Sequence, residues 1–337
     1  MKRKQIDKLI ENWEFDGESA NTELVETHIS WVILSDNFAF KIKRPVKYSF
    51  VDFSTLDKRK HYCCEEIKLN SRLAPEMYIS VLPVTEKMLE GGDMDDEDIV
   101  IDYMVQMERM DNEKEMDRLL AKRQVRRHEV EKLAEKIADF HKRVRIIKNA
   151  FDTIDFQETF NDILDIKDYV SEELGPDYEN IITRSTDLSD SYLNSRRSYF
   201  NDRIIRNFRR NCHGDLNASN IFLYNDPVIF DCIDFNKKLR FIDVLNEIAF
   251  LCVDLDFYGM DELSRHFYNT YINAYGAGES ELSRQLFMYY NAYRANVRAK
   301  VTAISAMEEE GSDTSKRDAV KKYLDLLDRY QENYSSD

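Results

Sequence analysis

Hydrophobic and polar positions alternate through much of the first hundred residues, as is typical of β-strands that bury one face. Residues 57–73 break this alternation: they contain good helix formers and stop before Pro75. Ser35-Asp36-Asn37 has the composition of a hairpin turn. The pattern predicts a small antiparallel sheet with one inserted helix, whose strand-like runs are 25–34, 38–46, 77–85 and 98–107.

From about Asn112 onward the periodicity is helical almost throughout, and short strand-like runs interrupt it only near His213. The chain has 337 residues, of which 43% are hydrophobic, which is enough to fill two cores. We therefore expect an α+β protein with an N-lobe over residues 1–107 and a larger, mostly helical C-lobe over residues 108–337.

Composition limits the cellular setting. No apolar run is long enough to span a bilayer, and the first residues lack the apolar segment of a secretory signal. The five cysteines form no Cys-x-x-Cys pair, which disfavours zinc and suits a reducing compartment. We expect a cytoplasmic protein without a membrane partner.

The formal net charge is −16. Proteins that bind nucleic acid carry surplus Lys and Arg to meet phosphates, so a nucleic-acid partner is disfavoured. The acidity favours a cationic substrate, although solubility explains it equally well.

The string His213-Gly214-Asp215-Leu216-Asn217-Ala218-Ser219-Asn220 is the strongest chemical signal. It places a carboxylate and a carboxamide five residues apart, the spacing of a phosphoryl-transfer catalytic loop. In such loops the Asp orients the attacking hydroxyl and the Asn holds Mg²⁺ on the nucleotide. A bare His-Gly-Asp favours only a turn, but here an apolar, strand-like run follows and leads to Asp231 and Asp234. This order of elements favours the catalytic interpretation.

A kinase-like site also needs a strand lysine for the phosphates and a helix carboxylate to hold that lysine. Alternate residues of Ala39-Phe40-Lys41-Ile42-Lys43 share a face, so Lys41 and Lys43 point together. We choose Lys41, with Lys43 as the second candidate; two solvated lysines on an edge strand are the alternative. Glu66 falls on the apolar stripe of the predicted helix, where a carboxylate needs a cation. The sequence predicts a Lys41–Glu66 ion pair, and a surface pair within the helix is the alternative.

Two phosphate-binding devices are missing. No Gly-x-x-x-x-Gly-Lys-Ser/Thr occurs, which excludes a P-loop kinase as the catalytic machinery. There is no glycine-rich lid either. At the expected position, backbone amides and the hydroxyls of Thr27 and Ser30 would have to cover the phosphates.

These residues resemble the aminoglycoside phosphotransferase-like group of the protein-kinase-like fold, which includes choline kinases. The match is most specific over Cys212–Phe235 and weaker over Leu133–His141 and 243–249. Residues 26–83, together with 231–259, are similar to an uncharacterised bacterial branch, some of whose members carry a separate P-loop kinase domain. Activity tied to that domain is not transferred to this chain.

The resemblance implies a role for each matching residue. Asp215 would be the catalytic base and His213 a brace for the loop. Asn220 and Asp231 would be metal ligands. Asp234 is similar to a second acid in relatives, but its spacing is one residue longer, which leaves the division of labour between the two acids open. The implied cofactors are ATP, or another nucleoside triphosphate, and Mg²⁺. Asp243 would tie the loop to the following helix, or simply be a satisfied buried carboxylate.

Adenine would be read by backbone groups of Met107, Glu108 and Arg109, where the last strand of the N-lobe ends. Only 11 residues separate Asp231 from Asp243, too few for a long activation segment, so a small hydroxylated acceptor is favoured over a protein. Acids that could pair an amine of that acceptor, or simply end a helix, are Asp254 and Asp256.

The sequence predicts a small-molecule kinase. A nucleotide-binding pseudokinase with a regulatory role and a protein kinase are the alternatives.

Overall fold

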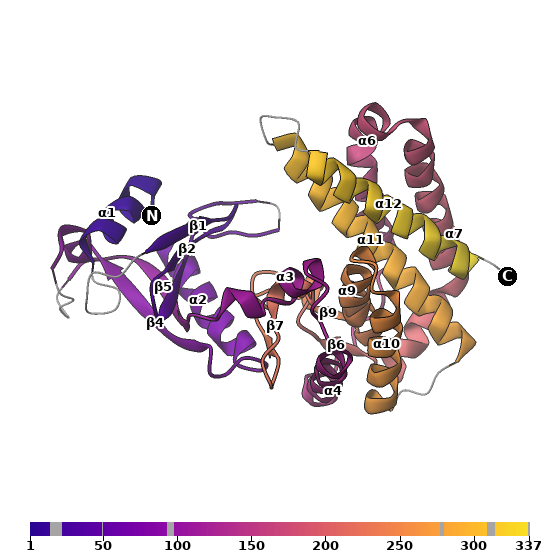
Figure 1. Cartoon of the computed structure of the whole chain (residues 1–337), viewed down its shortest axis with the longest axis horizontal. Coiled ribbons are helices and arrows are strands. Elements are labelled where there is room, and N and C mark those ends of the chain that lie inside the picture. Colours follow the sequence, from indigo (N-terminus) through magenta and orange to yellow (C-terminus); the bar gives the residue numbers. More distant parts are fainter. Residues whose placement is uncertain (14–21, 49, 93–97, 277–279, 309–313, 336–337) are drawn as a thin grey trace. The chain divides into compact units, whose positions relative to one another are not determined.

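The computed structural model describes residues 1–13, 22–48, 50–92, 98–276, 280–308 and 314–335 (Figure 1). They form two compact units: unit 1 comprises residues 1–115 and 220–239, and unit 2 comprises 116–219 and 240–337. The sequence predicted a single division at residue 107, which placed residues 220–239 in the C-lobe. In the structure, residues 220–239 belong to unit 1. These residues belong to unit 1 because the backbone N–H groups of Asp231 and Cys232 donate to Tyr78 and Asn70.

Unit 1 contains the predicted antiparallel sheet, with strand order β1-β2-β3-β5-β4. The predicted run 25–34 is in fact two strands, because residues 27–29 form a turn in which the Ser30 N–H donates to the Thr27 hydroxyl. The helix α1 was not predicted. The elements are α1 (Arg3–Asn12), β1 (Glu23–Glu26), β2 (Ser30–Leu34), β3 (Phe38–Lys43), α2 (Leu56–Asn70), β4 (Tyr78–Thr85), η1 (Lys87–Glu90), β5 (Val100–Glu108), η2 (Asn112–Lys114), β7 (Ile221–Phe222) and β8 (Val228–Ile229).

Each face of the sheet is covered by one helix (Figure 1). Phe40 and Ile42 of β3 lie on the face that packs against α1, in a buried cluster with Ile6 and Leu9. Ala39 lies on the other face, in a cluster with Cys63 of α2. The predicted alternation along β3 is therefore confirmed, and it places Lys41 and Lys43 on the α2 side.

Helix α2 presents Glu66 from a buried position. The Thr55 side chain accepts the Lys58 N–H and caps the helix, which explains where α2 begins. Its inward side carries Cys63, Glu66 and Leu69. Glu66 is thus the one carboxylate on the buried side of α2, which also carries the polar residues Arg59 and Asn70.

Unit 2 is mostly helical, and helix α9 lies at its centre. Every residue of α9 from Val244 to Leu255 is buried. The elements are α3 (Met116–Ala121), α4 (Arg127–Arg143), α5 (Thr153–Asn161), η3 (Asp162–Ile166), α6 (Lys167–Leu174), α7 (Pro176–Ile205), β6 (Arg209–Asn211), β9 (Phe241–Asp243), α9 (Val244–Phe257), α10 (Asp261–Tyr275), α11 (Glu281–Glu308) and α12 (Thr314–Ser335). Two short elements, η4 (Ala218–Asn220) and α8 (Lys237–Arg240), cross from one unit to the other.

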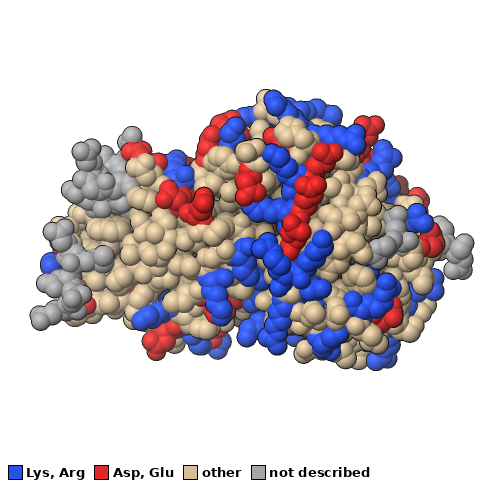
Figure 2. All heavy atoms as spheres, turned by 90° about the horizontal axis from the view of Figure 1, so that it is seen from below, with Lys and Arg blue, Asp and Glu red and all other residues tan. Residues whose placement is uncertain are grey.

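The surface of the protein is heterogeneous in charge. In the view of Figure 2, many Lys and Arg side chains lie next to one another, although the whole chain carries a net charge of −16. In the described parts of the chain, every helix falls short of the length and apolar character that crossing a bilayer would require.

Candidate functional site

Lys41, Lys43 and three carboxylates form one charged network in unit 1. Glu66 lies between the two lysines, 2.9 Å from the Lys41 Nζ and 2.7 Å from the Lys43 Nζ. Lys41 also contacts Asp231 at 2.5 Å, and Lys43 contacts Asp234 at 2.6 Å. The predicted Lys41–Glu66 pair is present, and Lys43 shares the same carboxylate. Neither lysine is the solvated edge residue of the alternative interpretation.

Burial and charge oppose each other in this network. Burial by itself would lower the pKa of Lys41, but the carboxylates of Asp231 and Glu66 outweigh it and raise that pKa well above 10.5. Burial would raise the pKa of Glu66, and the two ammonium groups outweigh it and lower the pKa from 4.5 to about 2. The lysines and Glu66 are therefore charged near neutral pH.

Asp231 and Asp234 occupy different environments. The Asp231 side chain is 45% exposed, whereas that of Asp234 is 7% exposed. Asp231 has a left-handed backbone with φ of 59°, an uncommon conformation that Asp tolerates better than most residues. Burial raises the pKa of Asp234, and its neighbour Lys43 opposes part of that rise. Asp231 is the acid that faces solvent, and Asp234 is the acid that holds Lys43.

The backbone expected to read adenine already has partners within unit 1. The Glu108 N–H donates to the Met77 carbonyl and the Arg109 N–H donates to the Asn37 carbonyl, both at 2.8 Å. The Met107 side chain is a core residue. At the β1–β2 turn, the Thr27 hydroxyl accepts the Ser30 N–H at 2.9 Å.

The catalytic-loop sequence forms a compact turn in unit 2. Gly214 has φ of 92°, a left-handed conformation that glycine adopts without a Cβ clash. His213 is buried, and its Nδ1 accepts the Asp215 N–H at 3.3 Å, as expected of a residue that braces the loop. The Asn217 side chain accepts the Ser219 N–H at 3.0 Å. Asn220 follows at the boundary with unit 1, where its carbonyl accepts the Phe230 N–H.

Glu247 of α9 holds the start of this loop, and Asp243 is the satisfied buried carboxylate of the alternative interpretation. The Glu247 carboxylate accepts the His213 N–H at 2.5 Å and the Gly214 N–H at 3.0 Å. Asp243 instead caps α9 through the Leu245 N–H and pairs with Arg203. A signal for Glu247 was present in the sequence, because an acid inside an apolar helix must find donors when it is buried.

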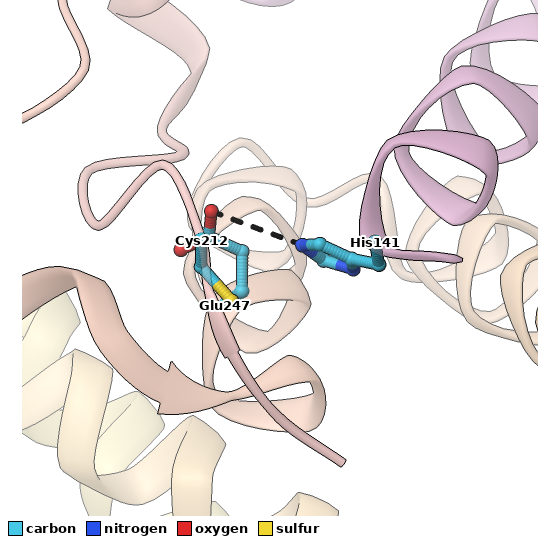
Figure 3. A group of neighbouring side chains, drawn as sticks. All are labelled: His141, Cys212 and Glu247. Carbon is cyan, nitrogen blue, oxygen red and sulfur yellow. Dashed lines mark ion pairs between the residues drawn. The ribbon is translucent and has the colours of Figure 1, made fainter. Parts of the chain in front are cut away.

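His141 and Cys212 lie beside Glu247 (Figure 3). They come from α4 and from the residue after β6, and all three side chains are buried. The His141 Nε2 is 4.0 Å from the Glu247 carboxylate, and its Nδ1 is 2.8 Å from the Tyr271 hydroxyl. A His-Cys-Glu trio has the chemistry of a metal site, but both Glu247 oxygens already accept loop amides. The arrangement therefore favours support of the loop over ligation of a metal.

The two acids predicted to meet an acceptor amine are already paired inside unit 2. Asp254 accepts the Ala218 N–H at 2.8 Å and contacts Arg298 at 2.8 Å. Asp256 contacts Arg329 at 2.9 Å and accepts the Tyr330 hydroxyl. This placement corrects the prediction, because these cations arrive from distant helices that the local sequence does not reveal.

Comparisons with known proteins concern both the sequence and the fold of this chain. No protein-family model matches the chain. Uncharacterised proteins of Mycobacterium tuberculosis and Mycobacterium bovis are 29% identical over 304 residues, which cover 89% of this chain. The same match covers 58% of each relative, so the chain spans a little over half of their length.

Several solved structures are similar over nearly all of this chain, and three of them are described in turn. A choline/ethanolamine kinase family protein from Mesorhizobium loti is 13% identical, with a TM-score of 0.56, and the match covers 98% of this chain and 99% of that one. The GDP complex of an aminoglycoside 2'-phosphotransferase IIIa mutant is 14% identical, with a TM-score of 0.54 and 98% coverage of both chains.

The third structure is amicoumacin kinase with AMP-PNP and Ca²⁺. It is 10% identical, with a TM-score of 0.59, and the match covers 98% of this chain and 94% of that one. At these identities the likeness shows the fold: the chain has the two-lobed, protein-kinase-like fold of choline kinases and aminoglycoside phosphotransferases, as the sequence predicted.

Proposed function

We propose that this protein, which has the fold of small-molecule kinases, is a Mg-ATP-dependent phosphotransferase that phosphorylates a hydroxyl group of a small molecule. The single observation that carries the proposal is the contact network of Lys41, Glu66 and Asp231. It joins a lysine, its helix carboxylate and a solvent-facing acid in one unit. That combination is what nucleotide phosphates and their metal require.

The donor set suits a hard divalent cation. The Asp231 carboxylate is 45% exposed, and Asn220 offers a carboxamide oxygen from the same unit. Mg²⁺ prefers oxygen ligands of this kind. Asp234 fits less well, because it is buried against Lys43 at 2.6 Å. When bound, the ion would neutralise charge that develops on the phosphates.

Residues of the chain would bind the nucleotide phosphates, orient the acceptor and support the catalytic loop. Lys41 carries the positive charge that would meet the nucleotide phosphates, and Glu66 holds its amino group in place. Asp215 would orient the acceptor hydroxyl and take up its proton. His213 and Glu247 fix the backbone on which Asp215 is mounted, so its carboxylate needs little reorganisation during transfer.

A small acceptor suits the short stretch between Asp231 and Asp243 better than a protein does. The class of acceptor follows from fold analogy alone, because the similar structures include a choline/ethanolamine kinase family protein and an aminoglycoside phosphotransferase. Amine-bearing alcohols and amino sugars are therefore the first compounds to test.

A nucleotide-binding pseudokinase is the second candidate. Two features favour it: the hydroxyl of Thr27 is engaged within its own turn, and the amides of Glu108 and Arg109 have protein partners. Such a protein would bind Mg-ATP without transferring phosphate.

The two candidates separate in one experiment. The wild type and Asp215→Asn are incubated with Mg-ATP and a pool of amino sugars, choline-like alcohols, nucleosides and cell-extract metabolites, and the products are followed by mass spectrometry. A product heavier by one phosphoryl group, formed only by the wild type, supports the kinase and identifies its acceptor class. Nucleotide binding without any such product supports the pseudokinase.

A further inference from the structure

Helix α9 offers two carboxylates to the backbone of the catalytic loop. Glu247 and Asp254 are seven residues apart, about two helical turns, so they lie on the same side of the helix. Glu247 accepts the N–H groups of His213 and Gly214, and Asp254 accepts the N–H of Ala218 at 2.8 Å. Asp215 lies between these contacts along the chain. The helix therefore holds the loop on both sides of the proposed base.

Asp254 is itself held by Arg298 of α11. Nε and one terminal nitrogen of the guanidinium group donate to Oδ1 of Asp254 at 3.1 and 2.8 Å. The Ala218 N–H uses the other carboxylate oxygen, Oδ2. The Asp254 side chain is only 1% exposed. A buried carboxylate in such a position requires a cation, and Arg298 supplies it with a fixed, two-point geometry.

The environment of Arg298 keeps it charged and in place. Burial would lower the pKa of Arg298, but the Asp254 carboxylate outweighs that effect and raises it, and Asp215 contributes in the same direction. The guanidinium group lies 5.5 Å from the ring centroid of Phe250 and 5.7 Å from that of Tyr323. These contacts restrict its rotation. Arg298 is thus a fixed positive charge within electrostatic range of the proposed base.

We propose that Arg298 is a positioning residue for phosphoryl transfer, which acts through Asp254 and the Ala218 amide to fix the backbone that carries Asp215. The inference rests on the function proposed above. It also gives Asp254 a different role from the recognition of a substrate amine that its sequence position suggested.

The test uses hydrogen exchange and turnover in the same set of variants. Arg298→Gln removes the charge, and Arg298→Lys keeps the charge but loses the two-point contact. Arg329→Gln is the matched control, because Arg329 pairs with Asp256 on the same helix and with Asp261. Amide exchange is followed over residues 213–219, and Mg-ATP turnover is followed with water as the acceptor. The affinity for ADP is measured alongside.

Arg298→Gln is expected to speed exchange of the Ala218 amide roughly 10- to 100-fold, the effect of losing the support of a charge-assisted hydrogen bond. Turnover should fall while the affinity for ADP stays within about twofold of the wild type. Arg298→Lys should recover part of both losses, and Arg329→Gln should match the wild type. Asp254→Asn combined with Arg298→Gln should cost little more than either change alone, because both act on one contact.

Unchanged Ala218 exchange in Arg298→Gln would overturn the proposal. Faster exchange with wild-type turnover would overturn it too, because the loop would then not depend on this support for catalysis. Exchange that rises equally throughout unit 2 would indicate general destabilisation and would also contradict a positioning role. If the wild type itself shows no turnover with water or any pooled acceptor, the proposed function fails, whereas the exchange data still report whether Arg298 holds the loop.

Discussion

Replacing Glu66 by Gln tests the charged network of unit 1 with almost no change in shape. The variant removes a carboxylate that is 1% exposed and contacts Lys41 at 2.9 Å and Lys43 at 2.7 Å. Each charge-assisted hydrogen bond contributes about 1.5–3 kcal/mol, and the Gln oxygen retains part of one of them. The free energy of unfolding is therefore expected to fall by about 3 kcal/mol. This value lies at the lower end of the loss usually seen when one partner of a buried ion pair is removed.

For a unit of this size, that loss corresponds to a decrease in Tm of about 10–15 °C, which calorimetry or circular dichroism can follow. Glu65→Gln is the matched control, because Glu65 is the neighbouring residue and pairs with the largely exposed Lys68. An exposed pair contributes about 0–1 kcal/mol, so Glu65→Gln should change Tm little. Equal Tm values for the two variants would refute the conclusion that Glu66 is a buried counter-ion.

The pH dependence gives a second measure of the same variant. The pKa of Glu66 is lowered from 4.5 to about 2 in the folded protein, so its stabilising contribution is complete above pH 4.5 and is lost as the pH falls through the folded value. The stability difference between the wild type and Glu66→Gln should therefore shrink as the pH is lowered from 5 towards 2. A difference that stays constant over this range would contradict the lowered pKa.

Two further predictions concern the lysines and the loop. Lys41→Met should weaken Mg-ATP binding about 10- to 100-fold, which is the effect of losing one charged contact. Lys43→Met should mainly lower Tm, because its partner Asp234 is buried. Titration calorimetry measures the affinities and thermal unfolding the Tm values, and equal losses of affinity in the two variants would contradict the different roles of the two lysines. Glu247→Gln should speed amide exchange at His213 and Gly214 and reduce turnover, because one amide loses its acceptor. Wild-type rates of amide exchange at His213 and Gly214 in that variant would contradict the role of Glu247 in holding the loop.

Local sequence patterns were sufficient for part of the site. The spacing from Asp215 to Asn220 lies within one loop, and the alternation along β3 places Lys41 opposite α2 without knowledge of the rest of the fold. A lone acid on an apolar helical stripe identified Glu66 for the same reason. Each of these signals is contained in a few neighbouring residues.

The errors concern contacts made by residues far apart in the chain. The prediction that Asp254 meets a substrate failed because its partner Arg298 lies 44 residues away, on another helix. Glu247 was not among the predicted site residues, because its local sequence does not show that it reaches the loop amides. The hydrogen bonds from the Glu108 and Arg109 amides to Met77 and Asn37 also depend on tertiary structure, whereas the reading of adenine by this backbone stays a prediction.

Nucleotide affinity and loss of the ATP γ-phosphoryl group, measured in the same samples, would show whether the protein is a kinase. The proteins compared are the wild type, Asp215→Asn and Asp231→Asn, each with and without Mg²⁺ and with the metabolite pool present. We expect Asp215→Asn to bind Mg-ATP like the wild type but to transfer no phosphate, and Asp231→Asn to lose both transfer and the Mg²⁺-dependent part of the affinity. Transfer that persists in Asp215→Asn, or Mg²⁺-dependent affinity that persists in Asp231→Asn, would contradict it.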